Sequence, residues 1–176
     1  MNNNRIDKIK EVVHLPLKWE RYNETLVRNE TNCYAHAIGS TYPCFGFYRI
    51  GVLSGNIISK EEYAQEYYSE KQVKTLFLKD MQFLNLDCQE IDFSTKEDLL
   101  EKIRFESLLK NQYVVLLFLY FWSNGKIPDF HFWRYDTEIG FSHKRYRQLP
   151  ITISDPIKQW PETWNIKCIG AFRITR

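Results

Sequence analysis

The pattern of hydrophobic positions along the chain changes at residue 113. Residues 113–121, YVVLLFLYF, form a continuous apolar run rich in β-branched and aromatic side chains, which predicts a strand covered on both faces. Four shorter segments follow this run and are separated by turn residues: FHFWRYD, GFSHKRY, ITISDP and KCIGAFRIT. The back half of the chain therefore predicts a largely antiparallel sheet of about five strands.

The front half of the chain has the signals of helices. A short helix is predicted to begin near Thr31 or Asn32, because either side chain can cap its first turn, and to end at Gly39. The chain before this helix, as far as Asn29, has no clear pattern and is interpreted as an N-terminal arm. Residues 42–56 contain several glycines and a proline, which is typical of a loop.

Two capping boxes predict further helices in the middle of the chain. Ser59 precedes Glu62 by three residues in SKEEYAQEYYSEK, and Ser94 precedes Glu97 by the same spacing. Leucine and isoleucine side chains after Ser94 give the second of these helices a partial apolar face. Two segments have the composition of short strands, although the first could extend the preceding helix: residues 73–80 and 88–93.

Helices in the front half and strands in the back half indicate the α+β class. The chain has 176 residues and no internal repeat, so we expect a single domain over residues 1–176, with a helical and loop excursion over residues 39–112. Apolar residues make up 44% and aromatic residues 16% of the chain, which is enough for a core built from large rings.

The charge balance argues against a nucleic-acid partner. The formal net charge is +2, from 24 Lys and Arg against 22 Asp and Glu, and there is no block of like charges. Residues 144–147, KRYR, could contact phosphates, but an exposed charged hairpin is the simpler explanation of this segment.

The cysteine pattern and the absence of a long apolar run bear on localisation. The four cysteines contain no C-x-x-C pair, so neither a zinc ribbon nor a dense disulfide framework is indicated. The sequence has no Sec-type signal and no run long enough to span a membrane. We expect a cytoplasmic protein, or one released by a non-Sec route, with no membrane partner.

Four residues are candidates for a site with a cysteine nucleophile: the cysteine itself, a base and two alternative orienting groups. Cys33 lies in the first turn of the short helix, where unpaired N–H groups and the helix dipole can lower the pKa of a thiol. A cysteine nucleophile also needs a base and a polar group that orients the base. His131 is the candidate base, and the candidate orienting groups are His143, twelve residues later, and Asp155.

The spacing alone leaves the choice between His143 and Asp155 open. If residues 137–140 form a four-residue hairpin loop, His143 pairs with Arg134 and faces away from His131. A bulge, or a loop of three or five residues, places His143 and His131 on the same face.

The order of the segments NCYAHA, DFHFWR, FSHK and SDP resembles the papain-like superfamily and, within it, the NlpC/P60-type cysteine peptidases. The resemblance implies a papain-like fold in which a helix bearing Cys33 packs on the sheet. It makes Cys33 the nucleophile, His131 the base and His143 the third residue, with Asp155 as its rival. It covers the order of elements and a few positions, since NlpC/P60 domains usually have Asp-Cys-Ser-Gly around the nucleophile.

The resemblance also implies a function. We expect a bacterial cysteine peptidase or amidase that needs no cofactor and acts on a peptide, protein or peptidoglycan-type amide bond. The backbone N–H of Cys33 would stabilise the oxyanion, and Asn29 or Asn32 is a candidate second donor. His36 is expected to support the site, and Trp133 is a candidate binding residue beside the base.

Two alternatives remain open on the sequence alone. His36 lies three residues after Cys33 on the same helix, so these two residues with His131 and His143 could form a Cys/His zinc site. A papain-like domain can also be catalytically silent and act as a binding module. Its surface would then use the five tryptophans: Trp19, Trp122, Trp133, Trp160 and Trp164.

Overall fold

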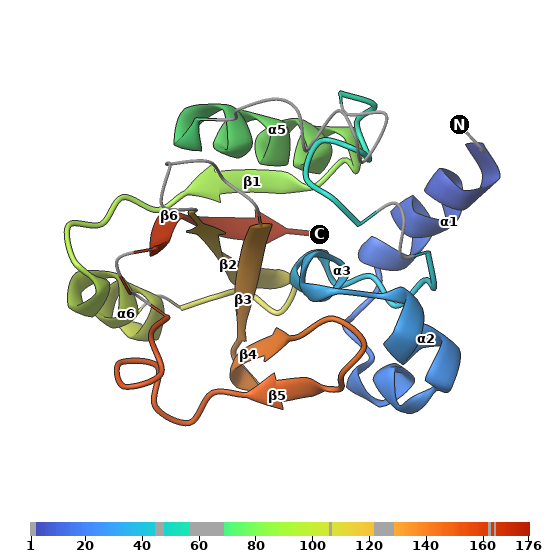
Figure 1. Ribbon diagram of the computed structural model, residues 1–176. Coiled ribbons are helices and arrows are strands. Elements are labelled where there is room, and N and C mark those ends of the chain that lie inside the picture. The colour runs from blue at the N-terminus through green and yellow to red at the C-terminus, as the bar shows by residue number, and fades with distance from the viewer. Residues whose placement is uncertain are drawn as a thin grey trace.

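The computed structural model describes residues 3–44, 48–56, 69–105, 107–121, 129–161, 163 and 165–176 (Figure 1). The helices in this part of the chain are α1 (Asn3–Val13), the 3₁₀ helix η1 (Trp19–Asn23), α2 (Thr25–Glu30), α3 (Cys33–Ile38), α5 (Glu70–Phe83) and α6 (Lys96–Phe105). The strands are β1 (Asp87–Glu90), β2 (Gln112–Tyr120), β3 (Asp129–Asp136), β4 (Gly140–Lys144), β5 (Pro150–Thr152) and β6 (Ile166–Thr175).

The strands form one open antiparallel sheet in the order β1-β6-β2-β3-β4-β5. The predicted α+β class is therefore confirmed, with six strands where about five were expected. The sixth strand is β1, which overlaps the strand predicted at residues 88–93 in the 39–112 excursion and pairs with β6 at one edge. The apolar run at 113–121 becomes β2, which lies inside the sheet with its middle residues buried on both faces.

Alternating side chains of β2 enter two different hydrophobic cores, one on each face of the sheet. On the first face, Val115 and Leu117 pack with residues of α1, α3 and α5. On the second face, Leu116 and Phe118 pack with α6 and with Trp160. Figure 1 shows α5 along the β1 side of the sheet and α3 beside β3. The sheet therefore holds α3 at a fixed position next to β3.

The interpretation of the N-terminus as a patternless arm was wrong. This segment contains α1, η1 and α2, and α1 contributes Ile9 and Val13 to the first core. Its charged residues dominate the composition, which hid the apolar stripe. Among the described residues, no helix combines the length and apolar character that a membrane crossing requires.

The middle of the chain differs from the prediction in two ways. Residues 73–80 are helical, which is the alternative to a strand that the sequence left open, because they belong to α5, whose start is a capping box formed by Ser69 and Gln72. The predicted box at Ser59 lies outside the described residues. Helix α6 is present, but its cap is shifted by one residue: the Thr95 hydroxyl accepts from the Asp98 N–H at 3.1 Å.

Candidate active site

Helix α3 is short because both of its ends are fixed by local chemistry. The Asn32 side-chain oxygen accepts hydrogen bonds from the N–H groups of Tyr34 and Ala35, each at 3.0 Å. Gly39 ends the helix in the left-handed conformation, with φ of 77°. A Cβ atom at Gly39 would lie 2.9 Å from the Arg134 guanidinium, so space as well as conformation requires glycine there. The predicted bounds of this helix are confirmed, and Cys33 is its first residue.

Cys33 lies against a part of the β3 edge that β4 does not cover. The β3–β4 pairing runs from Asp136 opposite Gly140 to Trp133 opposite His143 and stops there. The start of β3 is therefore open on this side, and the Cys33 thiol donates to the Phe130 carbonyl there at 3.9 Å. Tertiary packing of α3 against β3 thus brings the thiol beside the strand that carries His131.

The β3–β4 turn places His143 on the same face as His131. The turn contains three residues, 137–139, so His143 pairs with Trp133 and not with Arg134. His131 Nε2 and His143 Nδ1 are 2.9 Å apart, and the two rings meet edge to face. Because this hydrogen bond uses Nε2 of His131, Nδ1 is the ring nitrogen left for a reacting group.

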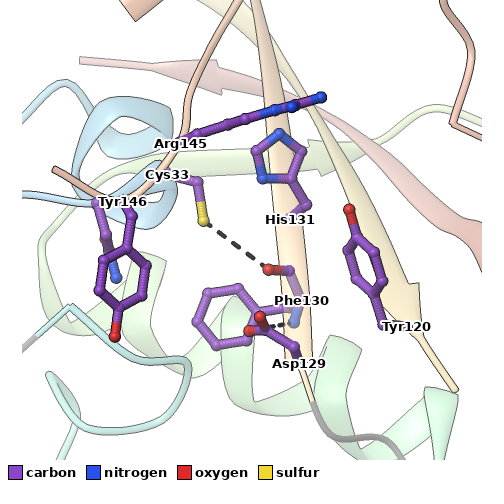
Figure 2. A pocket seen from close by; sticks show the side chains of 8 residues that line it. Cys33, Tyr120, Asp129, Phe130, His131, Arg145 and Tyr146 are labelled. Carbon is purple, nitrogen blue, oxygen red and sulfur yellow. Dashed lines mark hydrogen bonds between the residues drawn. The ribbon is translucent and has the colours of Figure 1, made fainter. Parts of the chain in front are cut away.

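Cys33 and His131 line the same pocket, which has a volume of about 390 Å³ (Figure 2). The residues that line it come from α3, β2, β3 and the segment after β4: Asn32, Cys33, Tyr120, Asp129, Phe130, His131, Arg145 and Tyr146. Figure 2 shows the thiol directed at the Phe130 carbonyl, with the His131 ring on one side and the Tyr146 ring on the other. The pocket is open to solvent, although Cys33 itself is only 8% exposed.

A second pocket, of about 280 Å³, adjoins the first. It shares Tyr120, His131 and Arg145 with the first pocket, and it also contains His143. Its remaining lining is largely apolar and comes from β3, β5 and the segment after β5: Trp133, Ile151, Thr152, Ile153, Gln159 and Pro161. The pair of histidines therefore lies between the two pockets.

The thiol of Cys33 and the imidazole of His131 are both uncharged at neutral pH. Burial, together with the nearby Asp129 carboxylate, raises the pKa of Cys33 to about 12. Burial, followed by the charges of His143 and Arg145, lowers the pKa of His131 to about 3. The expectation of a lowered thiol pKa was thus wrong, because desolvation outweighs the effect of a six-residue helix.

Asp155 does not line the pocket that contains Cys33. Its carboxylate accepts from the Lys158 N–H at 3.1 Å and forms an exposed ion pair with the Lys158 ammonium at 3.4 Å. These bonds hold the pKa of Asp155 below its usual range. Asp155 therefore stabilises a turn, which is the usual role of an aspartate before proline.

The three predicted supporting residues have different positions. Asn32 lines the pocket, and two contacts fix the orientation of its side chain: the amide donates one N–H to the Tyr48 carbonyl at 2.7 Å, and the side-chain oxygen caps the helix. His36 is fully buried on another side of α3, where Nε2 lies 3.0 Å from the Ser142 hydroxyl. Trp133 lines the second pocket and lies beside His143.

The structure bears on the zinc site and on the tryptophan surface that the sequence left open. No group of three or more His, Cys, Asp or Glu residues in the described part of the chain is placed to hold a metal ion. Trp133 and Trp160 are buried in the second core, so their rings do not form an exposed binding surface. Trp122 and Trp164 lie outside the described residues.

Lys144 is not part of a solvent-facing hairpin, contrary to the interpretation of KRYR. Its side chain is fully buried, and its ammonium donates to the carbonyls of Arg28 at 2.9 Å, Thr31 at 2.7 Å and Tyr146. Burial lowers the pKa of Lys144 to about 8. Because Thr31 immediately precedes Asn32, Lys144 ties the end of β4 to the start of α3.

Two charged residues of the pocket were missed at the level of sequence. Asp129 lies two residues before His131, and Arg145 lies two residues after His143. Side chains two residues apart in a strand point to the same face, so this alternation was the signal that could have found Asp129 in β3, whereas Arg145 lies just after the end of β4. Tyr120 and Tyr146 had no comparable signal, because they reach the pocket through pairing and chain reversal.

Comparison with known proteins gave no match, whether with protein-family models, curated proteins or solved structures. What is established is an α+β protein with one open antiparallel sheet, in which a cysteine at a helix start and a histidine pair meet at adjoining pockets. The function is therefore inferred from the site.

Proposed function

We propose that the protein is a papain-like cysteine hydrolase that cleaves an amide bond in a peptide, protein or peptidoglycan-type substrate. Cys33 is the nucleophile, His131 the base and His143 the residue that orients the base. The observation that carries the proposal is the arrangement of three side chains. The thiol and His131 line one pocket, and His143 holds Nε2 of His131 at 2.9 Å, as the orienting residue of a triad must.

In the proposed reaction, Nδ1 of His131 takes the thiol proton as the sulfur attacks the carbonyl carbon of the amide. The neutral state of both groups means that proton transfer accompanies attack, as in general-base catalysis. The imidazolium then gives its proton to the leaving amine, and a thioester to Cys33 remains. A water molecule, deprotonated by the same imidazole, hydrolyses the thioester and restores the thiol.

The N–H group of Cys33 is the oxyanion donor in this proposal. Asn32 caps the N–H groups of Tyr34 and Ala35, and its carbonyl accepts from the N–H of His36. Of the N–H groups in the first turn, that of Cys33 is the one outside this set. In this proposal it donates to the negative charge that develops on the carbonyl oxygen.

A catalytically silent domain is the second candidate, and one observation favours it. The thiol is 8% exposed, its pKa is raised to about 12 and it donates to the Phe130 carbonyl. In a silent domain the hydrogen bond from the thiol to the Phe130 carbonyl can persist. In the hydrolase this bond must break before the sulfur can bond to the substrate carbonyl.

Acylation by p-nitrophenyl acetate distinguishes the two candidates. The hydrolase is expected to transfer the acetyl group to Cys33 and to release p-nitrophenolate, followed by absorbance and by peptide-resolved mass spectrometry. Replacing Cys33 by alanine abolishes this acylation. The substitution His131→Gln slows it about 100-fold or more, which is the usual contribution of a general base.

Cys168→Ala is the matched control, because Cys168 is a half-buried thiol that lines neither pocket. In the Cys168→Ala variant, the rate at which Cys33 is acylated stays at the wild-type value. If Cys33 reacts no faster than Cys168, or if the rate at Cys33 is indifferent to His131→Gln, the protein is the silent domain.

A further inference from the structure

The two pockets lie on different sides of His131: the first contains Cys33, and the second contains His143. In the proposed reaction His131 protonates the leaving amine, so the leaving group lies on the His131 side of the thiol. The second pocket begins on that side, because it contains both His131 and His143 but not Cys33. The acyl part of the substrate then occupies the first pocket, and the leaving group extends toward the second.

Arg145 lies where the two pockets join and lines both of them. It is the only lysine or arginine among the described residues that line either pocket. Its side chain is exposed, and within the described part of the chain its guanidinium has no hydrogen bond and no ion pair. Arginine offers a planar set of donors that matches a carboxylate, and here those donors are available to a ligand.

The opposite end of the first pocket has the opposite charge. Asp129 lies there, and Figure 2 shows its carboxylate on the far side of the thiol from Arg145. One Asp129 oxygen accepts from the Phe130 N–H at 2.8 Å. An anionic group of the substrate is therefore repelled at the acyl end and attracted at the junction of the pockets.

We infer that Arg145 binds a carboxylate of the leaving group, at the junction of the two pockets. This inference rests on the proposed function and assigns its substrate class: an amide whose leaving amine carries a carboxylate. The apolar wall formed by Trp133, Ile151 and Ile153 lies next to that position and suits an apolar part of the same leaving group. The carboxylate belongs either to an acidic side chain or to the C-terminus of the leaving residue.

The first experiment compares two alkylating reagents of similar size, iodoacetate and iodoacetamide, at Cys33 by peptide-resolved mass spectrometry. The negative charge of iodoacetate makes its rate sensitive to Arg145. We expect Arg145→Gln to lower the ratio of the iodoacetate rate to the iodoacetamide rate about two- to fivefold, the range that one exposed charge pair gives. Added salt should reduce the difference in this ratio between the wild type and Arg145→Gln, since the charge of an exposed arginine is screened by salt.

Arg147→Gln is the matched control, because Arg147 is an exposed arginine two residues away that lines neither pocket. It leaves the ratio as in the wild type. A ratio that is the same in Arg145→Gln and Arg147→Gln overturns the role of Arg145 while leaving the hydrolase intact. If neither reagent modifies Cys33 in the wild type, the proposed function fails, and this inference with it.

The second experiment identifies the source of the carboxylate through protection of Cys33 from iodoacetamide. Leucine offers a terminal carboxylate, glutamic acid α-amide offers one on the side chain, and leucinamide offers none. Protection by leucine or by glutamic acid α-amide that disappears in Arg145→Gln supports the inference and names the source. Equal protection by leucinamide, or protection that survives Arg145→Gln, contradicts it.

Discussion

At the scale of single residues, the proposed reaction depends on the orientation of the His131 ring. The 2.9 Å contact between Nε2 of His131 and Nδ1 of His143 fixes that ring, and it also fixes the tautomer when His143 accepts. His143 is held in turn by Trp133, whose ring lies beside it on the paired strand. The third residue of the site is therefore a positioning residue that does not touch the substrate carbonyl in the proposed reaction.

We predict that His143→Asn and His143→Leu differ sharply in the acylation assay. The Asn side-chain oxygen lies as many bonds from Cα as Nδ1 of histidine, so His143→Asn keeps an acceptor for His131. Its acylation rate should stay within about threefold of the wild type, whereas His143→Leu should fall at least about tenfold, the equivalent of one lost orienting hydrogen bond. Equal rates for the two variants would show that the acceptor has no part in catalysis.

At the scale of elements, the site depends on how α3 meets the sheet. The helix packs against β3 and β4, and its N-terminal residue reaches the part of the β3 edge that β4 leaves free. Lys144 stabilises the contact between α3 and the sheet. Its ammonium, at the end of β4, donates to the carbonyls of Arg28 and Thr31. A buried ammonium with backbone acceptors holds these segments together at a position that no apolar side chain could serve.

Replacing Lys144 by methionine should destabilise the fold and the site together. Methionine has a similar length but cannot donate, so the buried carbonyls of Arg28 and Thr31 lose their partner. We expect the free energy of unfolding in urea to fall by about 2 kcal/mol, the typical cost of an unsatisfied buried polar group. The acylation rate of the folded fraction should fall as well, because Thr31 precedes the helix cap.

Lys158→Met is the control for this prediction. The Lys158 side chain is 84% exposed, and its ion pair with Asp155 is a surface contact. Its free energy of unfolding should stay within about 0.5 kcal/mol of the wild type. A Lys144→Met variant as stable as Lys158→Met would mean that the three carbonyl contacts contribute nothing.

At the scale of the whole molecule, one sheet separates two cores, and three histidines lie close to it: His36 is fully buried, and His131 and His143 are half-buried. His36 is enclosed by η1, α3 and β4, with the rings of Trp19 and Tyr22 against it. Burial, followed by the charges of Arg134 and Lys144, holds the pKa of His36 well below its usual range. The pKa of His131 is lowered to about 3, and that of His143 is also lowered, in both cases chiefly by burial. The folded protein therefore keeps these three histidines neutral.

This arrangement predicts that the protein loses stability in mild acid. Below pH 6.5, the ordinary pKa of histidine, the unfolded chain binds protons that the folded protein does not. The stabilisation is thus complete above about pH 6.5 and declines as the pH falls toward the lowered folded-state values. For the fully buried His36 alone, the free energy of unfolding should fall by about 1 kcal/mol between pH 7 and pH 5.5.

Urea unfolding at pH 7 and at pH 5.5 measures this loss. The substitution His36→Gln preserves a polar group near the Ser142 hydroxyl but does not titrate. Its stability should therefore change less with pH than that of the wild type, by about the same 1 kcal/mol. An unchanged pH dependence in His36→Gln would contradict the assignment of a neutral, buried His36.

The sequence by itself determined the features that depend on neighbouring residues, such as helix caps and apolar runs. The caps at Asn32 and Gly39 define α3, and the apolar run at 113–121 specifies the interior strand β2. The order of Cys33, His131 and His143 along the chain indicated the candidate site, because a helix start and alternating strands are set by neighbouring residues. The helices before Asn32 were missed because their weak apolar stripes become stable only through packing.

Tertiary structure decided what depends on distant partners. The face of His143 was settled by the three-residue turn at 137–139, since one more residue would have reversed it. Packing of α3 on β3 buried the thiol and raised its pKa, and it turned Lys144 from an apparent surface charge into an internal support. Register and burial are properties of the assembled sheet. No stretch of sequence contains both sides of those contacts, so only the folded molecule could determine them.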